Sequence, residues 1–102
     1  MKHMGYIFDL NSHKLGHIDD DGVAHDLSGH HLGKISHDGH IMDPTGHTVG
    51  HIGGDGKVYE NGHHIGSVHS DGSVHDPSGH RIGHADPPHE QFGGAALLLL
   101  IR

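Results

Sequence analysis

Five histidines recur along the chain at intervals of 16 or 17 residues, and each follows an acidic residue by three or four positions. The pairs are Asp9–His13, Asp26–His30, Asp43–His47, Glu60–His63 and Asp76–His80. A carboxylate beside an imidazole favours the protonated ring and can also orient a ring that binds a metal. Zinc, nickel and copper all accept imidazole nitrogens. One hypothesis is therefore a ring-shaped transition-metal site made of His13, His30, His47, His63 and His80.

Strand geometry limits this hypothesis. Equivalent residues of successive repeats would lie two strands apart, or roughly 10 Å, whereas zinc holds its nitrogen ligands at about 2.1 Å. The five rings could share an ion only if the repeats converge at that end. The favoured interpretation is plainer: acidic and polar residues at a turn satisfy local hydrogen bonds, and duplication copies them. No cofactor is then required, and Zn, Ni or Cu remain candidates for binding.

The 17 histidines also bear on charge. The chain carries a formal charge of −7 with neutral histidines, and adding 17 positive charges gives at most +10. Imidazoles of ordinary environment titrate near pH 6.5, so the surface charge should change strongly in mild acid. The negative balance at neutral pH argues against nucleic acid and anionic membranes as partners.

These histidines belong to a 17-residue repeat that sets the architecture. We number its positions from an apolar–glycine pair such as Leu15-Gly16, so that the histidines above stand at position 16. The four full copies are 15–31, 32–48, 49–64 and 65–81, with partial copies at 5–14 and 82–85. Short β-branched runs between glycine-containing turns predict hairpins.

The loop at positions 13–15 should be a three-residue turn with a left-handed last residue, which glycine suits. Such a loop places position 12 opposite position 16, and position 11 opposite position 17. It also places position 10 opposite position 1 of the next copy, as in the apolar pair Ile7–Leu15. In the short copy, Asn61-Gly62 predicts a two-residue turn that keeps this register.

The Asp-Gly at positions 7 and 8 predicts a two-residue turn as well, which would place position 4 opposite position 11, as in Ile18–His25. One face of the ribbon would then carry positions 1 and 10, and the other positions 4 and 11. Both faces would be partly apolar.

The two partial copies complement each other. The segment Ile82–Ala85 lacks a partner strand, and Gly5–Asp9 could supply it, which would remove exposed sheet edges. We therefore expect an all-β fold, a closed ring of five two-stranded hairpin units whose fifth unit is composite. An open β-meander or a β-solenoid is the alternative.

The pattern I-G-x-I-x-x-D-G-x-V-x-D-x-x-G-x-x, repeated over residues 5–85, resembles bacterial proteins with a five-fold β-flower domain. The resemblance implies five petals around an axis and carries no established activity. This chain departs from the pattern in its histidines at position 16 and in its C-terminal extension.

That extension divides the chain into a repeat domain, 1–85, and a tail, 86–102. Asp86-Pro87-Pro88 should end the β-ladder, and Gly93-Gly94 should form a flexible joint. The apolar run is too short to cross a bilayer, which needs about 20 residues. We expect the tail to contact a neighbouring subunit; a plug in its own ring and an unstructured tail are the alternatives. The oligomer contact would comprise Leu97, Leu98, Leu99, Leu100 and Ile101.

Composition bounds the function. The chain has no cysteine and only 31% hydrophobic residues, so a small core must be supplemented by closure or assembly. No signal peptide is visible, and a cytoplasmic location is the default expectation. Ser12, Ser28 and Ser78 lie in turns, and we expect no catalytic site.

The favoured function is a non-enzymatic, self-associating structural repeat protein whose tail links subunits into an oligomer or filament. The alternative is a histidine-rich protein that binds transition metals.

Overall fold

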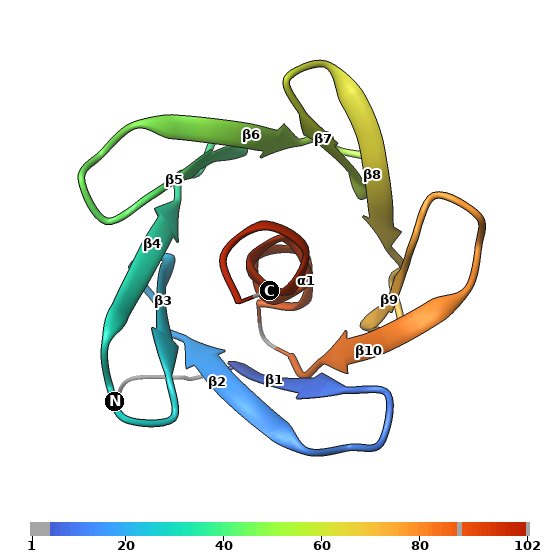
Figure 1. Cartoon of the computed structure of the whole chain (residues 1–102), viewed down its shortest axis with the longest axis horizontal. Coiled ribbons are helices and arrows are strands. Elements are labelled where there is room, and N and C mark those ends of the chain that lie inside the picture. Colours follow the sequence, from blue (N-terminus) through green and yellow to red (C-terminus); the bar gives the residue numbers. More distant parts are fainter. Residues whose placement is uncertain (1–4, 88, 102) are drawn as a thin grey trace.

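The computed structural model describes residues 5–87 and 89–101, which form ten β-strands and one helix. The elements in chain order are β1 (Gly5–Asp9), β2 (Lys14–Ile18), β3 (Val23–Asp26), β4 (His31–Ile35), β5 (His40–Met42), β6 (Thr48–Ile52), β7 (Lys57–Glu60), β8 (His63–Val68), β9 (Ser73–His75), β10 (Arg81–Ala85) and α1 (Glu90–Leu99). Each strand pairs antiparallel with its neighbours in sequence, and five hairpins surround the helix like petals (Figure 1).

The ring closes through the first and last strands. β1 pairs antiparallel with β10, with Ile7 opposite Ala85 and Asp9 opposite Gly83. The composite fifth unit and the closed all-β ring expected from the sequence are therefore confirmed. A closed ring leaves no strand edge with unpaired backbone groups.

The outer loops of the petals have the expected geometry. Each three-residue loop ends on a left-handed residue, with φ near +90° at Gly29, Gly46 and Gly79 and +65° at Ser12. In the short copy, Asn61 and Gly62 both have positive φ (53° and 84°), as the two-residue turn requires. Position 11 lies opposite position 17 throughout, and Glu60 lies opposite His63.

The Asp-Gly turns differ from the expectation. A two-residue turn of this kind needs positive φ at both residues, but of Asp21 and Gly22 only the glycine has it (+81°). The amide of Gly22 donates to the carbonyl of Asp19, and the amide of Asp19 donates to the carbonyl of Val23. The loop therefore spans three residues, 20–22, and the same geometry recurs in the other repeats.

That extra residue changes the register, and with it the faces of the ribbon. Position 4 lies opposite position 10, as in Ile18–Ala24, and position 3 lies opposite position 11, as in His17–His25. The predicted pairing of positions 4 and 11 is wrong. Positions 4 and 10 both point inward and are buried, so the ribbon has one apolar face rather than two.

A β-bulge shifts the pairing at position 1 too. Ile7 lies opposite Gly16 instead of Leu15, and the register shift recurs in all five petals. Glycine is needed beside the bulge because a Cβ at Gly16 would lie 2.2 Å from the carbonyl oxygen of His25. The extra residue, Leu15, is left half-buried.

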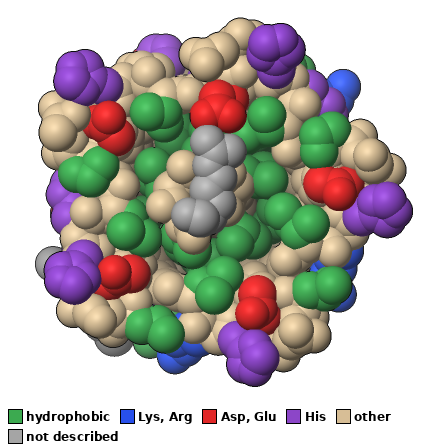
Figure 2. Space-filling view, in the orientation of Figure 1, with side chains coloured by type: hydrophobic (Ala, Val, Ile, Leu, Met, Phe, Trp, Pro, Cys, Tyr) green, Lys and Arg blue, Asp and Glu red, His purple; other side chains and the backbone are tan. Residues whose placement is uncertain are grey.

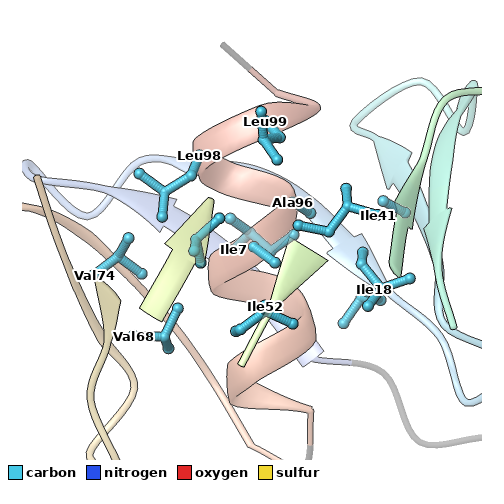
Figure 3. Packing of buried hydrophobic residues seen from close by; sticks show 13 residues of the cluster. Ile7, Ile18, Ile41, Ile52, Val68, Val74, Ala96, Leu98 and Leu99 are labelled. Atoms are coloured by element: carbon cyan, nitrogen blue, oxygen red, sulfur yellow. The ribbon is translucent and has the colours of Figure 1, made fainter. Parts of the chain in front are cut away.

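The core lies on the axis of the ring. Inward-facing residues of positions 4 and 10 surround α1, and Figure 3 shows them pointing toward Ala96, Leu98 and Leu99 of the helix. The buried ring residues of this cluster are Ile7, Ile18, Ala24, Ile35, Ile41, Ile52, Val58, Val68 and Val74. The strands of the ring and helix α1 thus share one hydrophobic core.

The tail lies inside its own ring as helix α1, which was the alternative expectation (Figure 1). The expected contact of Leu97–Ile101 with a neighbouring subunit stays a prediction. Alanine and leucine favour helix, and the ring supplies an apolar environment for every side of it. Gly93 and Gly94 form no flexible joint: both are buried within α1, where a Cβ at Gly94 would lie 2.3 Å from Cγ2 of Val68. Two glycines let the helix pass close to the strands.

Among the residues that the structure describes, no helix is both long and apolar enough to span a membrane.

Candidate functional site

Each outer loop carries its acidic residue and its histidine as a bonded pair. One carboxylate oxygen of Asp9 accepts the amides of Asn11 and His13, both at 2.9 Å. The other lies 3.2 Å from Nδ1 of the His13 ring. The loop conformation, which brings position 12 opposite position 16, sets this geometry.

The same arrangement recurs around the ring. The Nδ1–Oδ2 distance is 3.1 Å in Asp26–His30, 3.5 Å in Asp76–His80 and 3.8 Å in Asp43–His47. The expected facing of the two positions is confirmed by these contacts. We refer to the five Asp/Glu–His pairs, at residues 9/13, 26/30, 43/47, 60/63 and 76/80, as the rim pairs.

Hydrogen bonds hold the four rim aspartates in the ionised form. The backbone amide of His13 is the largest cause that lowers the pKa of Asp9, and the amides of His30 and His80 do the same for Asp26 and Asp76. For Asp43, the hydroxyl of Thr45 is the largest cause of the lowered pKa. The rim is therefore anionic at neutral pH.

The rim histidines do not form a shared site. The outer loops point away from the axis (Figure 1), so the convergence that a common ion requires is absent. The rings that contact their rim aspartates are highly exposed, with side-chain exposures of 74% to 82% for His13, His30, His47 and His80. Within residues 5–87 and 89–101, no three histidine, aspartate or glutamate side chains are grouped so as to hold a metal ion. Metal binding by individual rim histidines stays a prediction.

The face of the ring at which α1 ends is apolar at its centre. Half-buried hydrophobic residues from position 1 and from the end of the chain adjoin the core there, while Leu98 and Leu99 are buried below them. Figure 2 shows hydrophobic side chains around the middle of this face, with acidic residues and then histidines toward its edge. We call this the helix-end face; its apolar centre comprises Leu32, Val49, Ile65, Ile82, Leu97, Leu100 and Ile101.

The opposite face has a different character. The Asp-Gly turns lie there, beside the start of α1, where Nε2 of His89 lies 2.8 Å from Oδ1 of Asp20. The carboxylates of these turns also accept backbone amides, as Asp19 does from Asp21 and Val23 at 3.0 and 3.1 Å. The molecule therefore has one apolar end and one acidic end.

The outer wall holds stacked rings that the sequence did not predict. His17, His25 and His31 lie side by side on β2, β3 and β4, and Tyr6 approaches His17 edge-on. The expected two-residue Asp-Gly turn placed His25 opposite Ile18 and so hid this cluster. A three-residue loop at residues 20–22 would have put positions 3, 11 and 17 on one outer face.

The closed ring of five hairpins with matching turns defines a five-fold repeat protein of the β-flower type. A family model described as "5-fold beta-flower protein" matches residues 1–99, and the chain belongs to this family. The match includes α1, so the C-terminal extension is part of the family pattern and not a departure from it. No curated protein and no solved structure matches the chain.

Proposed function

We propose that this small repeat protein is a non-enzymatic structural module that pairs with a second copy of itself through the helix-end face. The observation that supports the proposal is the apolar centre of that face, which is surrounded by polar rim pairs. An apolar core within a polar rim is the usual composition of a protein interface.

The size of the face suits a second copy. The molecule measures 34 × 30 × 21 Å, and the helix-end face spans the two longer dimensions. An ellipse with those axes covers roughly 800 Å², which is close to the area that each partner buries in a stable interface of ordinary size. A second copy of this chain presents a face of the same size with the same apolar centre.

The chemistry of the two ends favours a face-to-face pair over a stack. Apposing two helix-end faces buries both apolar centres, whereas stacking places one against the acidic Asp-Gly turns. A twofold pair is also the commonest form of homo-oligomer. The expected role of the tail thus changes: Leu97, Leu100 and Ile101 contribute to the contact from within their own ring, while Leu98 and Leu99 hold the helix in place.

Charge should control the pairing. The rim carboxylates face one another across the proposed interface, and the whole chain carries −7 at neutral pH with a pI of about 6.1. Repulsion between copies is smallest near the pI. We expect association to be strongest near pH 6 and weaker at pH 8.

The absence of enzymatic activity is part of the proposal. Ser12, Ser28 and Ser78, the candidate nucleophiles of the sequence, are all exposed in outer loops, where their amides donate to the turn-forming aspartates. Nothing in these loops excludes water from the hydroxyls, which the desolvated sites of hydrolytic enzymes do.

Analytical ultracentrifugation of Ile101→Glu tests the proposal, with Gln91→Glu as the control. Both variants add one negative charge, but Ile101 lies on the helix-end face and Gln91 is exposed near the start of α1. At pH 6 we expect the wild type and Gln91→Glu to show twice the chain mass of 10.9 kDa, and Ile101→Glu to show the single mass. Circular dichroism verifies that both variants fold.

Two results would overturn it. A wild-type mass that stays at 10.9 kDa up to high concentration would exclude self-association. A series of larger masses would replace the paired arrangement with head-to-tail stacking.

A further inference from the structure

The outward-facing residues of the strands form a belt around the ring that contains no acidic side chain. Each strand turns two side chains away from the core, as β3 does with Val23 and His25, and these residues occupy repeat positions 3, 9, 11 and 17. They lie opposite one another from strand to strand around the whole ring. We call the residues at these four positions the belt.

The basic side chains gather on the belt. All the lysine and arginine residues that the structure describes belong to it and are exposed: Lys14, Lys34, Lys57 and Arg81. The carboxylates border the belt instead, in the rim pairs, in the Asp-Gly turns and at Asp86 and Glu90 near the start of α1. In Figure 2, which looks onto the helix-end face, lysine and arginine side chains appear only at the outline of the molecule.

This separation of charge changes what the net charge implies. A balance of −7 argues against a nucleic-acid partner, but it is an average over acidic ends and a wall without carboxylates. A partner responds to the local field of the surface that it touches, because salt screens charges beyond about 8–10 Å. The belt is therefore the surface of this chain that suits an anionic partner.

Aromatic rings lie among the basic residues of the belt. The three rings are those of Tyr6, Phe8 and Tyr59, and each lies beside a histidine ring. The centroid of Tyr59 is 5.0 Å from that of His51, and Nζ of Lys14 lies 3.9 Å from the ring centroid of Tyr6. Surfaces that bind single-stranded nucleic acid combine basic side chains with rings on which bases stack.

A hollow of about 320 Å³ opens on the belt beside β5, β6 and the turn after β7. His40, Thr48 and His51 of the belt line it together with Asn61, and none of the described residues that line it is acidic. These side chains offer N–H and O–H donors to phosphate or base oxygens. Asp38 engages Nδ1 of His40 at 3.1 Å, which leaves Nε2 of that ring for a ligand.

We propose that the belt binds single-stranded nucleic acid, with phosphates on its lysine and arginine side chains and bases against its rings. A flexible strand can follow the wall from petal to petal. Double-stranded DNA has a persistence length of about 500 Å and cannot wrap a molecule of 34 × 30 × 21 Å. A flat membrane would touch only one arc of the wall. The belt lies between the two ends of the ring, so the proposal does not rest on pairing through the helix-end face.

Fluorescence anisotropy with a labelled oligothymidylate of about 20 nucleotides tests the proposal on the full chain. We choose pH 6, because the chain is then near its pI of about 6.1 and repels a polyanion least. The test variant, Lys34→Gln with Lys57→Gln, removes two positive charges from the belt. The control, Ser70→Asp with Gln91→Glu, adds two negative charges at exposed positions outside the belt, so both variants have the same net charge.

We expect the test variant to bind at least about tenfold more weakly than the wild type at low salt. The slope of log affinity against log salt should fall by about 1.4, the amount for two lost phosphate contacts on a single strand. The control should bind as the wild type does. Circular dichroism verifies that both variants fold. Equal affinity of the two variants would overturn the proposal.

Tyrosine fluorescence supplies the second measurement, since both tyrosines of the chain, Tyr6 and Tyr59, lie on the belt and the chain has no tryptophan. Bases stacked on these rings should quench the emission, whereas inorganic polyphosphate should not. Saturation with oligothymidylate without quenching would contradict base stacking and overturn the proposal. It would also be overturned if polyphosphate or phosphatidylserine vesicles bound more tightly than the oligonucleotide, since the partner would then be another polyanion or a membrane.

Discussion

Nε2 of His89 lies 2.8 Å from Oδ1 of Asp20, and this contact joins the start of the central helix to a turn of the ring. The two residues are 69 positions apart in the chain. His89 is also the residue that precedes the first turn of α1, and its side chain makes no capping hydrogen bond to the helix. The contact therefore fixes the helix to the wall rather than closing the helix end.

A double-mutant cycle of His89→Ala and Asp20→Ala should reveal this coupling. Because Asp20 is 40% exposed, solvent screens the pair, and we expect a coupling free energy below about 1 kcal/mol. Urea denaturation measures it. The cycle of His89→Ala with Asp21→Ala is the control, and it should show coupling near zero. Equal coupling in both cycles would mean that general charge, and not this contact, accounts for the effect.

The central helix should contribute a large part of the stability through its buried leucines. Leu98 is 8% exposed and packs beside Gly66, whereas Leu27 is 65% exposed on an outer loop. We expect Leu98→Ala to lower the free energy of unfolding by about 2–4 kcal/mol through lost packing and a residual cavity. Leu27→Ala should change it by less than about 0.5 kcal/mol. Similar thermal midpoints for the two variants would contradict the packing of α1 within the ring.

Much of this fold could be predicted from the repeat alone. The complementary segments Gly5–Asp9 and Ile82–Ala85 implied closure, and β1 and β10 do pair. The turn Asn61-Gly62 was also correctly predicted, because both residue types tolerate positive φ. These features depend on local sequence signals that recur in each repeat, so an interpretation of one repeat can be checked against the other repeats.

The errors arose where local signals were ambiguous. Asp-Gly suits a two-residue turn and also the end of a three-residue turn, and only the φ of Asp21 distinguishes them. That single residue decides whether Ile18 faces Ala24 or His25, and hence whether His17 and His25 stack on the outer wall. Gly93-Gly94 was similarly ambiguous, since glycines permit both a joint and a close approach. The location of the tail depended on the space inside the ring, which no local pattern encodes.

Stability should fall in acid as the turn aspartates are protonated. The pKa of Asp26 lies below its ordinary value of 3.8, chiefly because the amide of His30 donates to it. A lowered folded-state pKa means that the contribution is complete above the unfolded value and is lost as pH falls through the folded one. Asp26→Asn keeps an oxygen that accepts the amides but does not titrate.

We therefore expect the wild type to exceed Asp26→Asn in stability at pH 6, and we expect this difference to shrink as the pH is lowered from 6 to 3. Chemical denaturation at both pH values measures it, and the pH 6 values serve as the internal reference. An advantage of the wild type that is as large at pH 3 as at pH 6 would show that ionisation of Asp26 contributes nothing.

Ser12 occupies a position that the other three-residue outer loops fill with glycine. Its φ is +65°, where Gly29, Gly46 and Gly79 have values near +90°. A non-glycine residue in this region costs roughly 1–2 kcal/mol, while the greater flexibility of unfolded glycine offsets about 0.5–1 kcal/mol. Ser12→Gly should thus raise the free energy of unfolding by up to about 1.5 kcal/mol. Ser28→Gly is the control, because Ser28 lies in an outer loop but does not have positive φ, and we expect it to lower the free energy of unfolding. Urea denaturation compares the two variants. A loss of stability in Ser12→Gly as large as that in Ser28→Gly would contradict the left-handed turn.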